Sequence, residues 1–237
     1  MPTTLFKAKF AGLPGTDLST IPPLIGTWGS FIDFNANGGV IEVDGGAQAR
    51  PRGIGATFVY GPMTGYTPPT GDRTIAMNVQ AGDQTGQNNV SVTMDTNAGN
   101  DSYVMGLSNN GIFIDKYLAG VFSSNLGTYN TGIVAGTNYN LQFDCYATKN
   151  FKVYSNGVKV LDVTDGTPIA GAIAQEYFIV NNQGPVTANV PRCGRLEFFD
   201  ALVPIVIPTY NAFKVGSGNG FTLNPSGIGR NAQLSGR

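Results

Sequence analysis

Carboxylates are the first side chains to consider for chemistry, because paired carboxylates perform general acid–base catalysis. Glu42 stands two residues before Asp44, and Glu197 stands three residues before Asp200. Glycoside hydrolysis needs two such groups roughly 5 Å apart for retention, or roughly 6.5–9.5 Å apart for inversion. Asp44 runs directly into two glycines, which favours a turn-forming aspartate over a base. The chain also has no histidine, the commonest general base. We therefore expect a protein that is not an enzyme.

The stretch DTNAGND at 95–101 is the best candidate for a calcium loop. Asp95, Asn97 and Asp101 offer hard oxygen ligands, but an EF-type loop also needs a bidentate glutamate at its twelfth position. That position is Gly106. The same composition is typical of a hairpin turn built on Asn and Asp side chains. We expect the turn, and we expect no metal or other cofactor.

Aromatic rings beside amides are what a sugar-binding surface needs, since a ring covers the apolar face of a sugar and amides bind its hydroxyls. Trp28 is the single tryptophan, and its place before the first long β segment predicts a packed anchor. Tyr60, Tyr66 and Tyr129 are flanked by Gly, Pro, Thr or Asn. These tyrosines are the better candidates for rings that contact a sugar.

Nucleic acids and membranes are poor partners for this chain. The net charge is −1, only 12% of the residues are charged, and the one tight basic pair is Arg50 with Arg52. The glycine-rich run at 216–220 lacks the Lys-Ser/Thr of a phosphate loop. The longest apolar run, 201–208, contains two prolines and is far shorter than the roughly 20 residues of a membrane span. The first residues lack the apolar stretch of a signal peptide.

Two cysteines, Cys145 and Cys193, lie 48 residues apart. A disulfide between them requires adjoining strands, which the sequence leaves open. The favoured interpretation is two buried thiols in a reducing compartment.

The elements that position these residues are predicted to be strands, because no long segment has helical periodicity free of Gly and Pro. Short segments rich in β-branched and aromatic residues recur between turn residues, which indicates an all-β sandwich or barrel of antiparallel strands. The predicted strands are Phe31–Phe34, Val40–Val43, Ile54–Tyr60, Thr74–Gln80, Val90–Met94, Ser102–Leu107, Gly111–Tyr117, Tyr139–Cys145, Phe151–Ser155, Val158–Val163, Glu176–Asn181 and Arg195–Ala201.

The best-defined local feature is a hairpin around Asn156-Gly157, a pair that suits a type I′ turn. The turn predicts that Ser155 faces Val158, that Tyr154 faces Lys159 and that Val153 faces Val160. Alternation then assigns one face to the core and the other to solvent. The predicted core face holds Phe151, Val153, Val158 and Val160, and the other face holds Lys152, Tyr154, Lys159 and Leu161.

Alternation in Tyr139–Cys145 likewise predicts one face that is buried in the core and one face that is exposed to solvent. Tyr139, Leu141, Phe143 and Cys145 are predicted to point inward. Asn140, Gln142 and Asp144 are predicted to point to solvent.

After Ala201 the composition changes to Gly, Asn and Ser with scattered large apolar residues. We therefore divide the chain into a sandwich domain, 1–201, and a C-terminal extension, 202–237. The extension is too short for its own core and too aromatic for an inert tail, so we expect an arm that lies on another surface. A last hairpin on the same sandwich is the alternative. The candidate partner-binding residues of the arm are Tyr210, Phe213, Phe221 and Leu223.

Two patterns together resemble a known fold family. The opening pattern G-T-x-L … P … G … W is carried by Gly15, Thr16, Leu18, Pro22, Gly26 and Trp28, and a late Y-x-N-G hairpin by Tyr154, Asn156 and Gly157. This order is similar to the concanavalin A-like (laminin-G-like) jelly-roll domains of tailed-phage virion proteins, over residues 5–201. The resemblance implies an antiparallel jelly roll. That fold is shared by lectins, glycan-binding modules, glycosidases and structural virion domains. The fold alone therefore does not determine the function. The clustered Glu-x-Asp-x-x-Glu of the glycosidases is absent.

Two hypotheses follow. The first is a structural virion protein of a tailed bacteriophage, assembled in the host cytoplasm. In this hypothesis it is a capsid decoration (cement) protein that binds the major capsid protein or other virion subunits, as a homo-oligomer for which we expect a trimer. A tail or baseplate position is its variant. The alternative is a carbohydrate-binding adhesin or lectin-like module that contacts host glycans.

Overall fold

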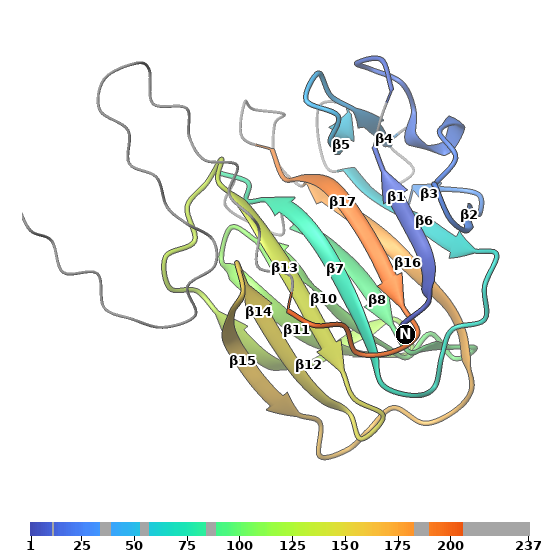
Figure 1. The fold of residues 1–237 in the computed structure, drawn as a ribbon, viewed down its shortest axis with the longest axis vertical. Coiled ribbons are helices and arrows are strands. Elements are labelled where there is room, and N and C mark those ends of the chain that lie inside the picture. Colours follow the sequence, from blue (N-terminus) through green and yellow to red (C-terminus); the bar gives the residue numbers. More distant parts are fainter. Residues whose placement is uncertain (11, 34–38, 53–56, 84–88, 183–189, 206–237) are drawn as a thin grey trace, which may run out of the picture.

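The chain folds into two antiparallel sheets packed face to face, as the computed structural model shows (Figure 1). The structure describes residues 1–10, 12–33, 39–52, 57–83, 89–182 and 190–205. Sheet A runs β15-β14-β13-β7-β17-β5-β4, with β1 beside β17. Its strands are β1 (Thr4–Lys9), β4 (Val40–Val43), β5 (Ala49–Arg52), β7 (Arg73–Gln80), β13 (Asn138–Cys145), β14 (Asn150–Ser155), β15 (Val158–Thr164) and β17 (Arg192–Phe199).

Sheet B runs β12-β11-β10-β8-β16-β6-β2, with β3 beside β6 and β9 beside β16. Its strands are β2 (Thr27–Trp28), β3 (Ile32–Asp33), β6 (Thr57–Thr64), β8 (Asn89–Met94), β9 (Thr96–Asn97), β10 (Ser102–Ser108), β11 (Gly111–Leu118), β12 (Val121–Tyr129) and β16 (Ile173–Asn182). A short 3₁₀ helix, η1 (Leu18–Thr20), lies before β2. The predicted all-β sandwich is confirmed, and every predicted segment overlaps a strand.

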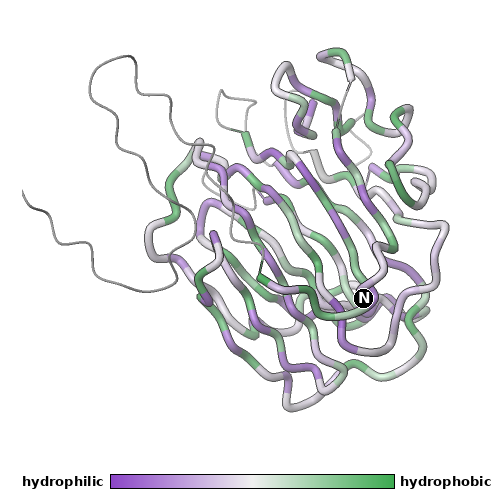
Figure 2. The backbone as a smooth tube through the Cα atoms, viewed as in Figure 1, coloured by the Kyte–Doolittle hydropathy of each residue, from purple (hydrophilic) through white to green (hydrophobic). Residues whose placement is uncertain are grey.

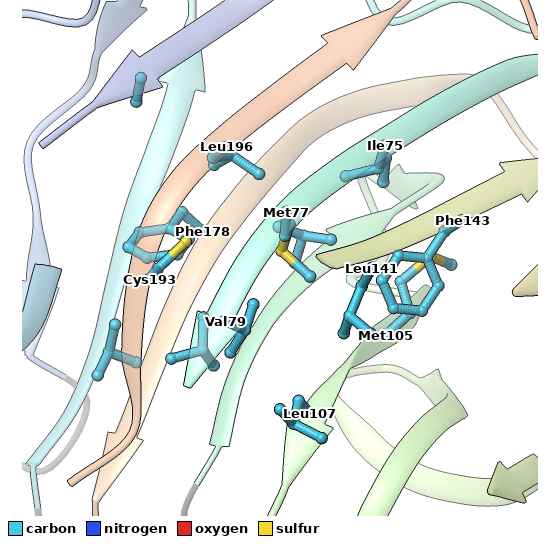
Figure 3. Close-up of a cluster of buried hydrophobic side chains, with 14 of the residues drawn as sticks. Ile75, Met77, Val79, Met105, Leu107, Leu141, Phe143, Phe178, Cys193 and Leu196 are labelled. Atoms are coloured by element: carbon cyan, nitrogen blue, oxygen red, sulfur yellow. The ribbon is translucent and has the colours of Figure 1, made fainter. Parts of the chain in front are cut away.

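The core lies between the sheets because side chains alternate along the strands. Hydropathy changes from residue to residue along the chain in the same way (Figure 2). Met77 of β7 and Leu141 of β13 meet Met105 of β10 and Phe178 of β16 between the layers (Figure 3). Cys145 and Cys193 are buried and unpaired, as the favoured interpretation held. No helix in the described part of the chain has the length and apolarity to cross a bilayer.

The hairpin at Asn156-Gly157 has the predicted turn and a register that differs from the prediction. Both turn residues have positive φ, 51° and 83°. Ser155 faces Val158 and Tyr154 faces Lys159, but Val153 then faces Leu161 because a bulge inserts one residue. The bulge turns Leu161 against the core and leaves Val158 exposed. The predicted core place of Val158 was therefore wrong. Phe151 and Val153 are buried as predicted, and Val160 packs against the core as predicted.

A strap, residues 201–205, crosses the outer face of sheet A in front of β7 and β13 (Figure 1). The Val203 amide donates to Thr74 Oγ1 at 3.2 Å, and the Val203 carbonyl accepts from Gln142 Nε2 at 3.1 Å. Asp144 accepts from both Thr74 and Gln142 at 2.8 and 3.0 Å. The predicted inward residues of β13 are buried as expected. Gln142 and Asp144 point outward but are buried as well, which corrects the prediction that this face is exposed to solvent.

Candidate functional site

A pocket of about 550 Å³ opens at the edge of the sandwich, between β4 of sheet A and β2, β3 and β6 of sheet B. Ligand sites in proteins typically have volumes of roughly 300–1,000 Å³. The described residues that line the pocket combine aromatic, hydroxyl and carboxylate groups. They are Asp17, Ser19, Trp28, Gly29, Ser30, Phe31, Asp33, Gly39, Val40, Ile41 and Val59.

The aromatic side of the pocket is a pair of rings, Trp28 and Phe31, whose centroids lie 5.4 Å apart. Trp28 also packs on Phe6 at 4.8 Å and on Phe178 at 6.1 Å, so the predicted anchor is confirmed. Phe31 lies over Gly61 of β6, where an added Cβ would come within 2.7 Å of the ring. Glycine at that position is what lets the ring lie against the strand.

The Trp28 indole N–H is buried and has no hydrogen-bond acceptor among the residues that the structure describes. Buried indole N–H groups usually have a hydrogen-bond acceptor, and leaving that hydrogen bond unmade costs free energy. Trp28 therefore carries an unsatisfied donor within a residue that lines the pocket. The prediction from the sequence treated Trp28 as an anchor alone and missed its place in the pocket wall.

The polar side of the pocket is built on Asp17 and Asp33. Asp17 caps η1: its Oδ1 accepts from the Ser19 amide at 2.9 Å and from Ser19 Oγ at 2.7 Å. Leu18 anchors this helix in the core. Asp33, in β3, accepts from the Gly39 amide at 2.7 Å. A backbone N–H thus holds one oxygen of each carboxylate, which fixes the carboxylates in the wall before any ligand arrives.

The three tyrosines expected to contact sugars are not brought together. Tyr66 packs against the core, and its hydroxyl lies 3.4 Å from Glu176 Oε2. Tyr129 also packs against the core. Tyr60 stays half-buried on the outer face of sheet B, 6.0 Å from the ring of Tyr177. Burial, together with the nearby Tyr117 and Tyr177, raises the pKa of Tyr60 to about 12.

The acidic pairs considered for catalysis are engaged in ion pairs. Glu42 accepts from Arg50 Nη2 at 2.8 Å, with Arg52 3.8 Å away. Asp44 accepts the amides of Gly46 and Gln48, as a turn aspartate does, and lies 2.9 Å from Arg192 Nε.

Glu197 and Asp200 have partners of their own. Glu197 pairs with Lys7 at 2.8 Å and with Arg195 at 2.6 Å. Asp200 accepts the Thr3 amide.

The segment 95–101 forms the expected turn. Asn97 Oδ1 accepts the amides of Gly99 and Asp101 at 2.9 and 3.0 Å, which is the Asx geometry predicted from the sequence. Asp95 pairs instead with Arg73 and Lys149. The part of the chain that the structure describes contains no group of three or more His, Cys, Asp or Glu side chains arranged to hold a metal.

Arg73 and Asp95 belong to a buried ionic cluster that also contains Glu176 and Tyr66. Glu176 is fully buried, and this burial raises its pKa to about 7, although Arg73 nearby lowers it. Among the described residues, its Oε1 has no hydrogen-bond partner. Arg73, Asp95 and Glu176 are buried, whereas Tyr66 is half-buried.

Comparison with known proteins gives the fold. No protein-family model matches the chain, and no curated protein matches it. Domain 4 of AbnA, a GH43 extracellular arabinanase from Geobacillus stearothermophilus, in complex with arabinotriose, has a TM-score of 0.56 at 15% identity. The match covers 87% of this chain and 96% of that one. The ligand binding domain of botulinum neurotoxin serotype D, in complex with N-acetylneuraminic acid, has a TM-score of 0.54 at 6% identity over 85% of this chain.

The binding domain of Paraclostridial Mosquitocidal Protein 1 is similar as well, with a TM-score of 0.51 at 11% identity over 85% of this chain. The chain spans about half the length of the two toxin domains, 48% and 49%. These likenesses show a jelly-roll β-sandwich, which is the coarse part of the expected resemblance. They carry no assignment to virions. Tyr210, Phe213, Phe221 and Leu223 lie outside the described residues.

Proposed function

We propose that this protein is a non-catalytic carbohydrate-binding module and that the pocket at Trp28 is its binding site. The observation that carries the proposal is the pairing, in one pocket, of two aromatic rings with two oriented carboxylates and an indole N–H that has no acceptor. A sugar ring has an apolar C–H face and a rim of hydroxyls. Rings cover the face, and carboxylates accept from the hydroxyls.

The fold supports the proposal without deciding it. The arabinanase domain, of which the match covers 96%, was solved in complex with arabinotriose, so one sandwich of this shape takes a sugar. Fold alone does not imply function, which is why the argument stands on the pocket.

The single tryptophan makes the test direct. Trp28 is the only source of indole fluorescence, so a sugar that enters the pocket changes its emission, whereas a sugar bound on either outer sheet face leaves the emission unchanged. We expect a saturable change when the full chain is titrated with the best glycans found on an array. Binding that calorimetry detects while the emission stays constant would place the sugar elsewhere.

A conservative variant separates binding from folding. Trp28→Phe keeps an aromatic ring on Phe6 and Phe178 but removes the N–H, so we expect sugar affinity measured by calorimetry to fall roughly tenfold. The smaller ring loses part of the packing on Phe6 and Phe178, so we expect a stability loss of about 1–2 kcal/mol with the fold retained. Tyr177→Phe, on the outer face of sheet B, is the matched control and should bind as the parent does.

Capsid decoration stays a prediction of the sequence. The candidate partner-binding residues of its arm lie outside the described part of the chain, and its test is binding to assembled particles. A sugar-binding pocket and an assembly arm are compatible, because the pocket lies at the β4 edge whereas the strap contacts β7 and β13 in the middle of sheet A.

A further inference from the structure

We infer that the pocket selects uncharged sugars and discriminates against anionic ones such as sialic and uronic acids. This inference rests on the proposed function and adds the class of ligand to it. The observation behind it is the sign of the charge on the pocket wall: both ionisable residues among the described lining residues are aspartates.

The two aspartates are positioned as acceptors. One oxygen of Asp17 is held by the Ser19 amide and hydroxyl, and one oxygen of Asp33 is held by the Gly39 amide. Ionised carboxylates only accept hydrogen bonds, so the ligand groups that match them are donors. Sugar hydroxyls are donors, whereas a sugar carboxylate is a further acceptor with the same charge as the wall.

The arginines of the neighbouring strand do not reverse this charge. Arg50 and Arg52 of β5 both face Glu42, at 2.8 and 3.8 Å, and Arg52 also donates to the Gly15 carbonyl at 3.1 Å. Neither arginine is among the described residues that line the pocket. Residues 34–38 and 53–56, which flank β3, β5 and β6 in sequence, contain no Lys or Arg. A cation that would pair with a sugar carboxylate is therefore missing from the described wall.

The size of the discrimination follows from charge repulsion at the mouth of a pocket. Two unit charges a few ångströms apart near a protein surface repel enough to weaken binding about tenfold or more. The preference should decline as salt is added, because the carboxylates are partly exposed and salt screens them.

The test compares matched sugars on the full chain. A glycan array that contains neutral glycans and their sialylated or uronic-acid counterparts identifies the bound structures, and Trp28 emission then measures the affinity of each matched pair, for example lactose and 3′-sialyllactose. We expect the uncharged member to bind about tenfold more tightly. Equal or tighter binding of the anionic member, with a change in Trp28 emission, would overturn the inference and leave the proposed function intact. An array on which no glycan binds would overturn both.

Variants assign the effect to the pocket. Asp33→Asn keeps an acceptor oxygen for the Gly39 amide and removes the charge, so the ratio of neutral to anionic affinity should narrow several-fold. Asp162→Asn removes the same charge from β15, the opposite edge of sheet A, and should leave that ratio unchanged. A ratio that narrows equally in both variants would mean that overall charge, and not the pocket wall, sets the preference.

Discussion

At the scale of single residues, the side chain most at odds with its surroundings is Glu176. It is fully buried near the start of β16, beside Tyr66 and the ion pair formed by Arg73 and Asp95. Removing a carboxylate from water disfavours its charged form, and the pKa rises from 4.5 to about 7. The folded protein therefore binds a proton that the unfolded chain has released over this pH range.

The direction of the pH effect follows from that proton. Between pH 4.5 and 7 the native state holds more protons than the unfolded state, so the free energy of unfolding falls as the pH rises and is flat above pH 7. The shift corresponds to a loss of roughly 3 kcal/mol across the window. Urea denaturation at pH 5 and pH 8 measures it.

Glu176→Gln isolates the contribution of this residue, because glutamine fills the same space without titrating. We expect most of the fall between pH 5 and pH 8 to disappear and the variant to exceed the parent in stability at pH 8. Asp162→Asn, on an exposed strand, should keep the slope of the parent. A parent protein as stable at pH 8 as at pH 5 would show that Glu176 is not protonated in the folded state.

Gly61 connects backbone packing to the pocket. A methyl group there would meet the Phe31 ring at 2.7 Å, so Gly61→Ala must push that ring away from β6 and into the pocket. We expect sugar affinity to fall by an order of magnitude, with a loss of stability of about 1–3 kcal/mol from overpacking. Calorimetric titration and thermal unfolding of the same sample measure both. Gly71→Ala, where nothing lies within 4 Å, is the control. Unchanged affinity in Gly61→Ala would remove Phe31 from the binding site.

At the scale of elements, the strap explains why outward-facing side chains on sheet A are buried. Its hydrogen bonds join Val203 to Thr74 and Gln142, which in turn hold Asp144. Burial beneath the strap raises the pKa of Asp144, against the lowering effect of the two hydrogen bonds. The first residues of the predicted extension thus lie on sheet A through the hydrogen bonds of Val203.

Two truncations test the strap. A chain ending at Asp200 loses both bonds to Val203 and should be less stable by about 1–3 kcal/mol than a chain ending at Ile205. Denaturant unfolding compares the two directly, and the shared loss of 206–237 cancels. Equal stabilities would mean that the strap lies on the sheet without contributing to the fold.

The strands that sequence patterns found and those they missed differ in a physical way. Buried strands such as β7 and β13 were found because β-branched and aromatic residues fill their core faces. The edge strand β12 was missed: it is mostly exposed and contains Ser, Asn and Gly. An edge strand needs little apolar area, so the composition that marks a strand is absent from it. The bulge in β15 was also missed. The turn at Asn156-Gly157 sets the register only of the residues next to it, and it does not predict an extra residue farther along the strand.

The pocket was out of reach of sequence patterns because its wall is assembled from segments that pair only in three dimensions. Asp17 caps a three-residue helix, Asp33 lies in a two-residue strand, and Ile41 lies in β4 of the other sheet. The sequence predicted the strands at Asp33 and Ile41, but it gave no sign that they and Asp17 meet around one pocket. The one signal present in the sequence was the single tryptophan, Trp28, which was interpreted only as a packed anchor.

At the scale of the whole molecule, the two sites of interest lie on different parts of the sandwich. The pocket lies where β4 of sheet A meets β2, β3 and β6 of sheet B, and the strap crosses the middle of sheet A. We therefore expect the proposed pocket and the predicted arm to act independently.

Removing residues 206–237 tests that independence. A chain ending at Ile205 keeps every described residue of the pocket, so its affinity for the glycan identified on the array, followed through Trp28, should stay within about twofold of the full chain. If the removed residues form the predicted arm, light scattering should show that the full chain self-associates and that the shortened chain does not. Loss of the Trp28 response in the shortened chain would place part of 206–237 in the pocket. The two activities would then be one, because a segment that completes a binding site is not free to hold a neighbouring subunit.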